Sequence, residues 1–144
     1  ALYSDGSLFH GASLQGIKHI HQLDQSGLLL ECVIEKSVAE VQGEFLLGDS
    51  NVLANDLVYQ ALLVWTSKRI GSGSLPTSTE SWQVFREVEV GEYFFIKLNI
   101  TKHLGQSVFG DLLLIDQHNN IMSKITGAEV TCSANLSQLF KTSA

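Results

Sequence analysis

The apolar and polar positions of this chain predict one long helix that is buried on every side. Residues 52–65 hold eleven apolar side chains and three polar ones, and at helical spacing they leave no polar stripe over the first three turns. Ser50 or Asn51 can cap the N-terminus, and Gly71, which follows two basic residues, suits the C-terminus. We therefore expect a central helix at about residues 52–69, covered by other parts of the chain.

Short apolar segments on both sides of this helix have the length and composition of strands. Before the helix they are Leu28–Ile34 and Val38–Leu47, and after it Trp82–Val90, Tyr93–Thr101, Val108–Asp116 and Ile121–Cys132. One or two strands, a long buried helix and four further strands suit a curved antiparallel sheet that wraps around the helix. We expect this α+β architecture, which is the hot-dog fold.

The chain has the length of one domain, and no internal repeat or low-complexity tract divides it. We expect residues 1–144 to form a single hot-dog domain, with a lead-in loop and turn at 1–26, the hot-dog itself at 27–133 and a tail at 134–144. Because the chain starts at Ala1 without an initiator methionine, we also expect it to be a fragment of a longer multidomain chain.

The charge and the composition exclude several classes of protein. Nine Lys and Arg residues against fifteen Asp and Glu give a net charge of −6, whereas a protein that binds nucleic-acid phosphates needs a basic face. No apolar run approaches the ~20 residues that cross a bilayer, and no signal-peptide pattern opens the chain. Cys32 and Cys132 lie far apart in apolar segments, so we expect two reduced core thiols in a cytoplasmic protein.

Asp56 and Gln60 are the polar side chains of the helix that can carry chemistry. Their i, i+4 spacing places them on one face, one turn apart. Burial disfavours an ionised carboxylate, and a buried carboxyl group can therefore serve as a proton donor near neutral pH. In the alternative interpretation, Asp56 bonds to loop amides near the helix N-terminus and Gln60 marks the helix edge. The spacing alone leaves both interpretations open.

The motif Asp56-x-x-x-Gln60 on a central helix resembles the Asp-x-x-x-Gln/His motif in the second hot-dog of polyketide-synthase dehydratase domains. Residues 9–17, FHGASLQGI, look like the Tyr-Gly-Pro-x-Phe-Gln-Gly segment that leads into the same half, with its Tyr and Pro replaced. Downstream, the Leu-Pro pair at 75–76 and the run WQVFR at 82–86 stand where the family has a Leu-Pro pair and a strand. The resemblance covers nearly the whole chain.

Longer strings resemble one branch of this family. They are similar to the C-terminal segment of the large polyketide-synthase-type subunit of bacterial polyunsaturated-fatty-acid synthases. The strings are YSDGSLFHG, LQGIKHI, NDLVYQALLVW, GSLP and WQVFREVEV. The resemblance implies a role in polyunsaturated fatty acid or polyketide biosynthesis, inside a synthase with several other domains.

The resemblance also implies a site and a reaction. In the family, the aspartate protonates the departing β-hydroxyl of a 3-hydroxyacyl thioester, and the glutamine orients it. Asp56 is then the general acid and Gln60 the orienting residue, acting on a chain carried by the phosphopantetheine of an acyl carrier protein. No metal and no diffusible cofactor is implied. The residues placed near the substrate are His10, Gly11, Leu53, Leu57 and Tyr59.

The catalytic base of the family is missing from this sequence. In the family, a histidine from a His-x-x-x-Gly-x-x-x-x-Pro motif in the first hot-dog removes the α-proton. The histidines of this chain, none of which stands in that motif, are His10, His19, His21, His103 and His118. Because the family pairs two hot-dogs edge to edge, we expect a preceding half or a second copy of the chain as the partner.

Two other functions stay open at this point. A degenerate dehydratase half can organise or dimerise the synthase or hold an acyl chain, and the missing base favours this role. The same scaffold can also carry an isomerase, product-template or thioesterase-like activity. All of these functions place Asp56 at the acyl site.

Overall fold

A computed structural model describes residues 16–34 and 50–133, apart from the side chains of 50–53 and 133. Within these ranges, the chain forms one α-helix and seven strands. They are β1 (Ile17–Asp24), β2 (Gly27–Val33), α2 (Ser50–Arg69), β3 (Gly73–Ser78), β4 (Ser81–Val84), β5 (Tyr93–Leu104), β6 (Ser107–Asp116) and β7 (Ile121–Ser133). The helix expected at about 52–69 is therefore confirmed, with two more residues at its start.

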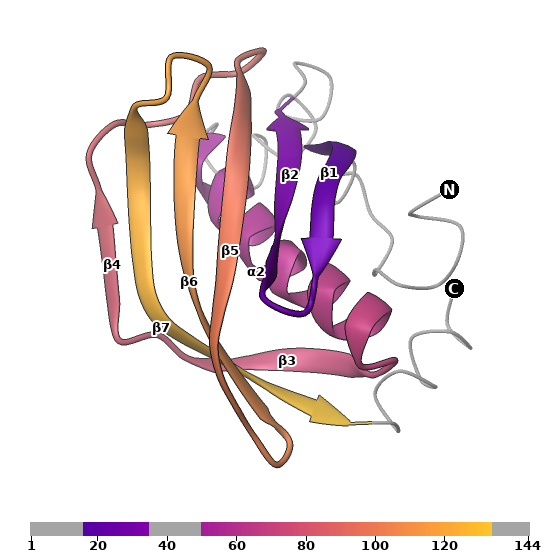
Figure 1. The fold of residues 1–144 in the computed structure, drawn as a ribbon. Coiled ribbons are helices and arrows are strands. Elements are labelled where there is room, and N and C mark those ends of the chain that lie inside the picture. The colour runs from indigo at the N-terminus through magenta and orange to yellow at the C-terminus, as the bar shows by residue number, and fades with distance from the viewer. Residues whose placement is uncertain (1–15, 35–49, 134–144) are drawn as a thin grey trace.

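The strands form one antiparallel sheet that curves across α2 (Figure 1). The strand order is β1-β2-β5-β6-β7-β3, and β4 pairs with β7 beside β3. Because β3 and β4 pair with successive parts of β7, they share one edge of the described sheet, and β1 forms the other edge. This arrangement is the predicted curved sheet around one helix.

The core lies between α2 and the inner face of the sheet. In β6, every second residue is buried, as expected for a strand with one face on the core. Leu30, Ile96 and Leu112 of neighbouring strands and Leu62 of α2 are all fully buried in this cluster. Burial of such a side chain stabilises the fold by ~1.5–3 kcal/mol.

The C-terminus of α2 has the cap that the sequence predicts. Gly71 takes a left-handed conformation with φ 81°, which a glycine adopts without a steric cost. The backbone N–H groups of Ile70 and Gly71 both donate to the carbonyl oxygen of Thr66. This closure lets the chain leave the helix and turn directly into β3.

β1 and β3 are strands that the sequence does not predict. β1 lies in the range 1–26 that we expected to be a lead-in loop and turn, and the structure corrects this boundary. As an edge strand it exposes His19 and Ile20, so it lacks a clean apolar alternation. β3 contains Pro76, which an edge strand tolerates because one side of its backbone needs no ladder donor.

The strand expected at Trp82–Val90 is shorter than predicted, because β4 ends at Val84. The following segment is an ordered loop that returns to the core, where Val88 is buried. Near the start of this loop, Arg86 binds Glu92 close to the end of the loop and also binds Asp116 of β6. The predicted strand Val38–Leu47 lies outside the described residues, as do the lead-in residues before 16 and the tail at 134–144.

Candidate functional site

Asp56 and Gln60 are joined by a hydrogen bond on α2, as their spacing predicts. Gln60 Nε2 donates to Asp56 Oδ2 over 2.7 Å. Gln60 is 4% exposed, whereas Asp56 is half-buried. Next to them Asn55 is exposed, so α2 has a solvent-accessible strip at 55–56 that the apolar pattern did not predict. The bond holds the carboxylate through one oxygen at the border between core and solvent.

Gln60 also presents an unused acceptor. Among the described side chains, its Oε1 is the single buried nitrogen or oxygen atom without a hydrogen-bond partner. A buried carbonyl oxygen left in this state costs ~1–3 kcal/mol, and native structures hold few of them. The amide therefore binds the carboxylate with its donor, while its buried acceptor has no partner among the described residues.

The two other described residues that were expected near the substrate differ in their surroundings. Leu57 is fully buried, and its methyl groups pack so close to Gly16 that a Cβ there would lie 2.8 Å from one of them. Tyr59 is half-buried, and its ring faces that of Trp82 on β4, with centroids 5.8 Å apart. Leu57 thus fills the core, whereas Tyr59 reaches the boundary of the core next to Asp56.

The described histidines are all exposed and lie on the sheet or its turns. They are His19 and His21 on β1, His103 on β5 and His118 in the turn after β6. His21 Nε2 lies 2.7 Å from Glu31 Oε1, and its ring faces Phe95. His19 and His21 are therefore on a solvent-exposed strand. His10, Gly11 and the side chain of Leu53 lie outside the described residues.

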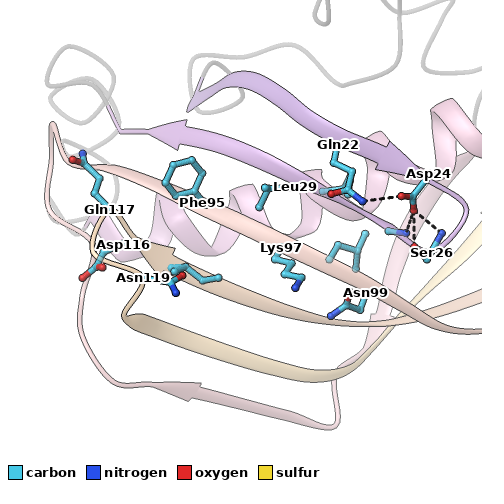
Figure 2. A pocket seen from close by; sticks show the side chains of 14 residues that line it. Gln22, Asp24, Ser26, Leu29, Phe95, Lys97, Asn99, Asp116, Gln117 and Asn119 are labelled. Atoms are coloured by element: carbon cyan, nitrogen blue, oxygen red, sulfur yellow. Dashed lines mark hydrogen bonds between the residues drawn. The ribbon is translucent and has the colours of Figure 1, made fainter.

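A cavity of about 410 Å³ lies on the outer face of the sheet (Figure 2). Its apolar floor consists of Leu29 of β2 and of Phe95 and Ile115, which are register partners on β5 and β6. Lys97 and Asn99 also line it, and α2 contributes no residue. The cavity is large enough for a small ligand, yet the sheet separates it from Asp56 and Gln60. The local sequence pattern does not reveal this cavity, because its residues come together only through the pairing of the strands.

One carboxylate of this cavity, Asp24, organises the turn between β1 and β2. It accepts hydrogen bonds from the side chain of Gln22, the backbone and hydroxyl groups of Ser26, and the backbone N–H of Gly27. These donors, with the Ser26 hydroxyl first among them, lower the pKa of Asp24 to about 2. The Asp24 carboxylate is therefore occupied by the hydrogen bonds of the turn, and few of its lone pairs remain to bind a ligand.

The second carboxylate of the cavity, Asp116, is engaged in the same way at the other end. It accepts from the backbone N–H groups of His118 and Asn120 and from Arg86 Nη2. The Asn120 N–H is the main cause that lowers the pKa of Asp116 to about 2. Arg86 in turn binds Glu92, so this network fastens the loop after β4 to the turn after β6.

Among the described residues, neither the possible metal ligands nor the two cysteines form a further functional site. No group of three or more His, Cys, Asp or Glu side chains in 16–34 and 50–133 is arranged to hold a metal ion. Cys32 and Cys132 are free and buried, as predicted, and burial raises the pKa of both thiols. Within the same ranges, the single helix is not long and apolar enough to cross a membrane.

The sequence matches known synthases. Residues 1–139 match the model of the family described as polyketide synthase dehydratase N-terminal domain. One subunit of the polyunsaturated fatty acid synthase of a Thraustochytrium species is 29% identical over 109 residues, which are 74% of this chain and 4% of that protein. The chain therefore spans a small part of this relative. The family is named for an N-terminal domain, so our assignment of the chain to the second hot-dog stays a prediction.

The fold is similar to solved structures of two kinds of synthase domain. The dehydratase domain from the CurJ module of the curacin polyketide synthase has a TM-score of 0.67 at 14% identity, over 88% of this chain and 45% of that one. A trans-acyltransferase polyketide synthase enoyl-isomerase has a TM-score of 0.64 at 16% identity, over 84% of this chain and 46% of that one. At these identities, the likeness shows the hot-dog fold alone.

Proposed function

Because the chain belongs to the polyketide synthase dehydratase N-terminal domain family, we propose that it is one half of a dehydratase of a polyunsaturated-fatty-acid synthase. The substrate is a 3-hydroxyacyl thioester on the phosphopantetheine of an acyl carrier protein. The products are a 2-enoyl thioester and water. In this proposal the domain works in the cytoplasm and needs no metal or diffusible cofactor.

Asp56 acts as the general acid in this reaction. A base removes the α-proton, the electron pair forms the new double bond, and the bond from the β-carbon to its hydroxyl breaks. Asp56 gives its proton to the departing hydroxyl, which leaves as water. The base is a histidine of another hot-dog half, since the described histidines of this chain are all exposed on the sheet and its turns.

The observation that carries the proposal is the open acceptor of Gln60. Its Nε2 holds Asp56 Oδ2, while its buried Oε1 has no partner among the described residues. A substrate hydroxyl near Asp56 can donate to this oxygen and so complete its hydrogen bonding. The same contact turns a lone pair of the hydroxyl toward the proton of Asp56. Gln60 thereby orients both the acid and the leaving group.

The partner half is expected to join the sheet at one of its edges. β1 forms one edge of the described sheet, and β3 with β4 forms the other. An edge strand carries unpaired backbone donors and acceptors that a second sheet can bind. We propose that a preceding hot-dog half, or a second copy of this chain, pairs there. Sedimentation of the isolated chain as a strict monomer at micromolar concentration would count against the second copy.

Mass spectrometry of an acyl carrier protein tests the reaction. The natural polypeptide that carries this chain is incubated with a 3-hydroxyacyl carrier protein, and loss of water is followed on the intact carrier. We expect Asp56→Asn to lower the rate by about a hundredfold or more while its circular dichroism stays unchanged. Asn55→Ala, at the exposed neighbouring position, is the matched control and should keep the wild-type rate. A folded Asp56→Asn variant with full turnover would refute the general-acid role.

The second candidate function is a catalytically silent half that holds an acyl chain or organises the synthase. The absence of the family's histidine motif from the sequence favours it. This function predicts that neither the wild-type polypeptide nor the Asp56→Asn variant releases water from the substrate, although the acyl carrier protein still binds to both. Dehydration by the wild type would exclude this role.

A further inference from the structure

An aromatic pair between α2 and β4 lies next to Asp56. Tyr59 follows Asp56 by three residues, so the two side chains share one side of the helix. The rings of Tyr59 and Trp82 have centroids 5.8 Å apart and an interplanar angle of 54°, a tilted geometry that aromatic pairs favour. Both rings are half-buried and pack against the core. The pair is thus a stiff apolar surface beside the proposed acid.

This apolar surface continues along β4 into solvent. Val84 lies two residues after Trp82, so both side chains stand on the same face of the strand. Val84 is 54% exposed, although it is a strand residue with a β-branched apolar side chain. β4 pairs with β7 on one side, and this part of its face has no cover among the described residues. An apolar strip therefore leads from Tyr59 past Trp82 to Val84.

We propose that Trp82, held in place by Tyr59, forms the wall against which the acyl tail lies and thereby determines the chain length that the site accepts. The inference rests on the proposed function, because the β-hydroxyl is placed at Asp56. From that point the alkyl tail runs along the strip of Tyr59, Trp82 and Val84. Trp82 contacts the tail and not the reacting atoms, so it is a specificity-determining residue and takes no part in proton transfer.

The wall is selective for physical reasons. A tryptophan ring has two rotatable side-chain bonds, and contact with Tyr59 and the core limits both. A longer tail covers more of the strip of Tyr59, Trp82 and Val84, whereas a shorter tail leaves part of this apolar surface exposed to water. A difference of one methylene in an apolar pocket changes kcat/KM by about tenfold or more. A change at Trp82 should therefore alter the ratio between long and short substrates more than the overall rate.

Chain-length profiles of the natural polypeptide test the wall. Dehydration is measured with carrier proteins that bear 3-hydroxybutyryl, 3-hydroxyoctanoyl and 3-hydroxydodecanoyl groups. We expect Trp82→Ala to change the ratio of kcat/KM between the longest and the shortest substrate by about tenfold, and Trp82→Phe to change it less. Phe85→Ala removes an aromatic ring that is 62% exposed and should leave the ratio as in the wild type.

Photolabelling of the wild-type polypeptide gives a readout that needs no turnover. A carrier protein with a 3-hydroxyacyl chain that ends in a diazirine is bound, irradiated and mapped by peptide mass spectrometry. We expect labels at Tyr59, Trp82 or Val84. Labels on other segments alone would overturn the wall, whether or not the Trp82→Ala variant folds.

The two experiments separate the two proposals. If the wild type dehydrates its substrates but a folded Trp82→Ala variant keeps the same length ratio, the wall is wrong and the dehydratase stands. If no dehydration occurs but the label reaches Trp82, the wall stands and the dehydratase is wrong. If the wild type neither dehydrates its substrates nor is labelled at Trp82, both the dehydratase and the wall are refuted.

Discussion

The indole Nε1 of Trp65 donates a hydrogen bond to the backbone carbonyl oxygen of Asp24 over 2.8 Å. The bond joins the C-terminal half of α2 to the turn between β1 and β2. Trp65 is 4% exposed, so its ring contributes apolar burial as well as this donor. The helix is thereby fixed against the edge hairpin, and the direction in which Asp56 and Gln60 project is fixed with it.

Loss of the Trp65 donor should destabilise the fold. We expect Trp65→Phe to lower the free energy of unfolding in urea by about 2 kcal/mol, because a buried hydrogen bond and part of a packed ring are lost. Trp82→Phe is the matched control, since that ring is half-buried and its N–H has no hydrogen-bond partner among the described residues. Equal losses in the two variants would show that the Asp24 contact contributes nothing specific.

A buried hydroxyl pair joins α2 to β3. Thr66 Oγ1 and Ser74 Oγ lie 2.9 Å apart, and Thr66 and Ser74 are 0% and 6% exposed. We expect Thr66→Val to cost about 1–3 kcal/mol of unfolding free energy, because it leaves the buried Ser74 hydroxyl without this partner. Ser74→Ala should cost less, because Thr66 Oγ1 also donates to the carbonyl oxygen of Leu63. The double variant should cost less than the sum of the two. Strict additivity in urea unfolding would show that the hydroxyl groups do not interact.

Gly27 is the position where a methyl group should be most harmful. A Cβ there would lie 1.8 Å from the carbonyl oxygen of Leu98, and the φ of 157° also disfavours other residues. We expect Gly27→Ala to lower the free energy of unfolding by about 3 kcal/mol or more, or to prevent folding. Gly105→Ala, at φ 59° with no atom within 4 Å of the new Cβ, should cost about 1 kcal/mol. Thermal unfolding that ranks the two in the opposite order would contradict this.

How far the fold follows from the sequence depends on the position of each element. α2 and β6 are readable because one is apolar on nearly every side and the other buries every second residue. β1 and β3 are not, because edge strands have weak patterns: β1 exposes His19, and β3 contains Pro76. Their pairing with β2 and β7 is decided by contacts distant in sequence, which a local pattern does not contain.

The same distinction applies to the site. The hydrogen bond between Asp56 and Gln60 follows from helical spacing, a local property. The contact between Tyr59 and Trp82 does not, because it depends on where β4 lies beside α2. The open acceptor of Gln60 is also a property of its surroundings, since the sequence indicates a buried amide but not which of its atoms stays without a partner.

Asp116 should make the free energy of unfolding depend on pH in the acid range. Its folded pKa of about 2 lies below the ordinary value of 3.8, so the ionised carboxylate stabilises the folded state above about pH 4. This stabilisation is lost as the pH falls from about 4 toward 2. We expect the free energy of unfolding to decrease over this range in the wild type and to decrease less in Asp116→Asn. Glu87→Gln, at an exposed position, is the control. A variant profile identical to that of the wild type would contradict the assignment.

Gln60 should show a conflict between stability and activity. Gln60→Met replaces the amide by an apolar side chain of similar length, which removes the buried Oε1 that has no partner among the described residues. The hydrogen bond to half-buried Asp56 is lost as well, so we expect the free energy of unfolding to stay within about 1 kcal/mol of the wild type or to rise. Dehydration by the natural polypeptide should fall by about tenfold or more, because neither the acid nor the hydroxyl is then oriented. Urea unfolding and carrier mass spectrometry on the same preparations measure both effects. A loss of more than about 2 kcal/mol with unchanged turnover would make Gln60 a structural residue.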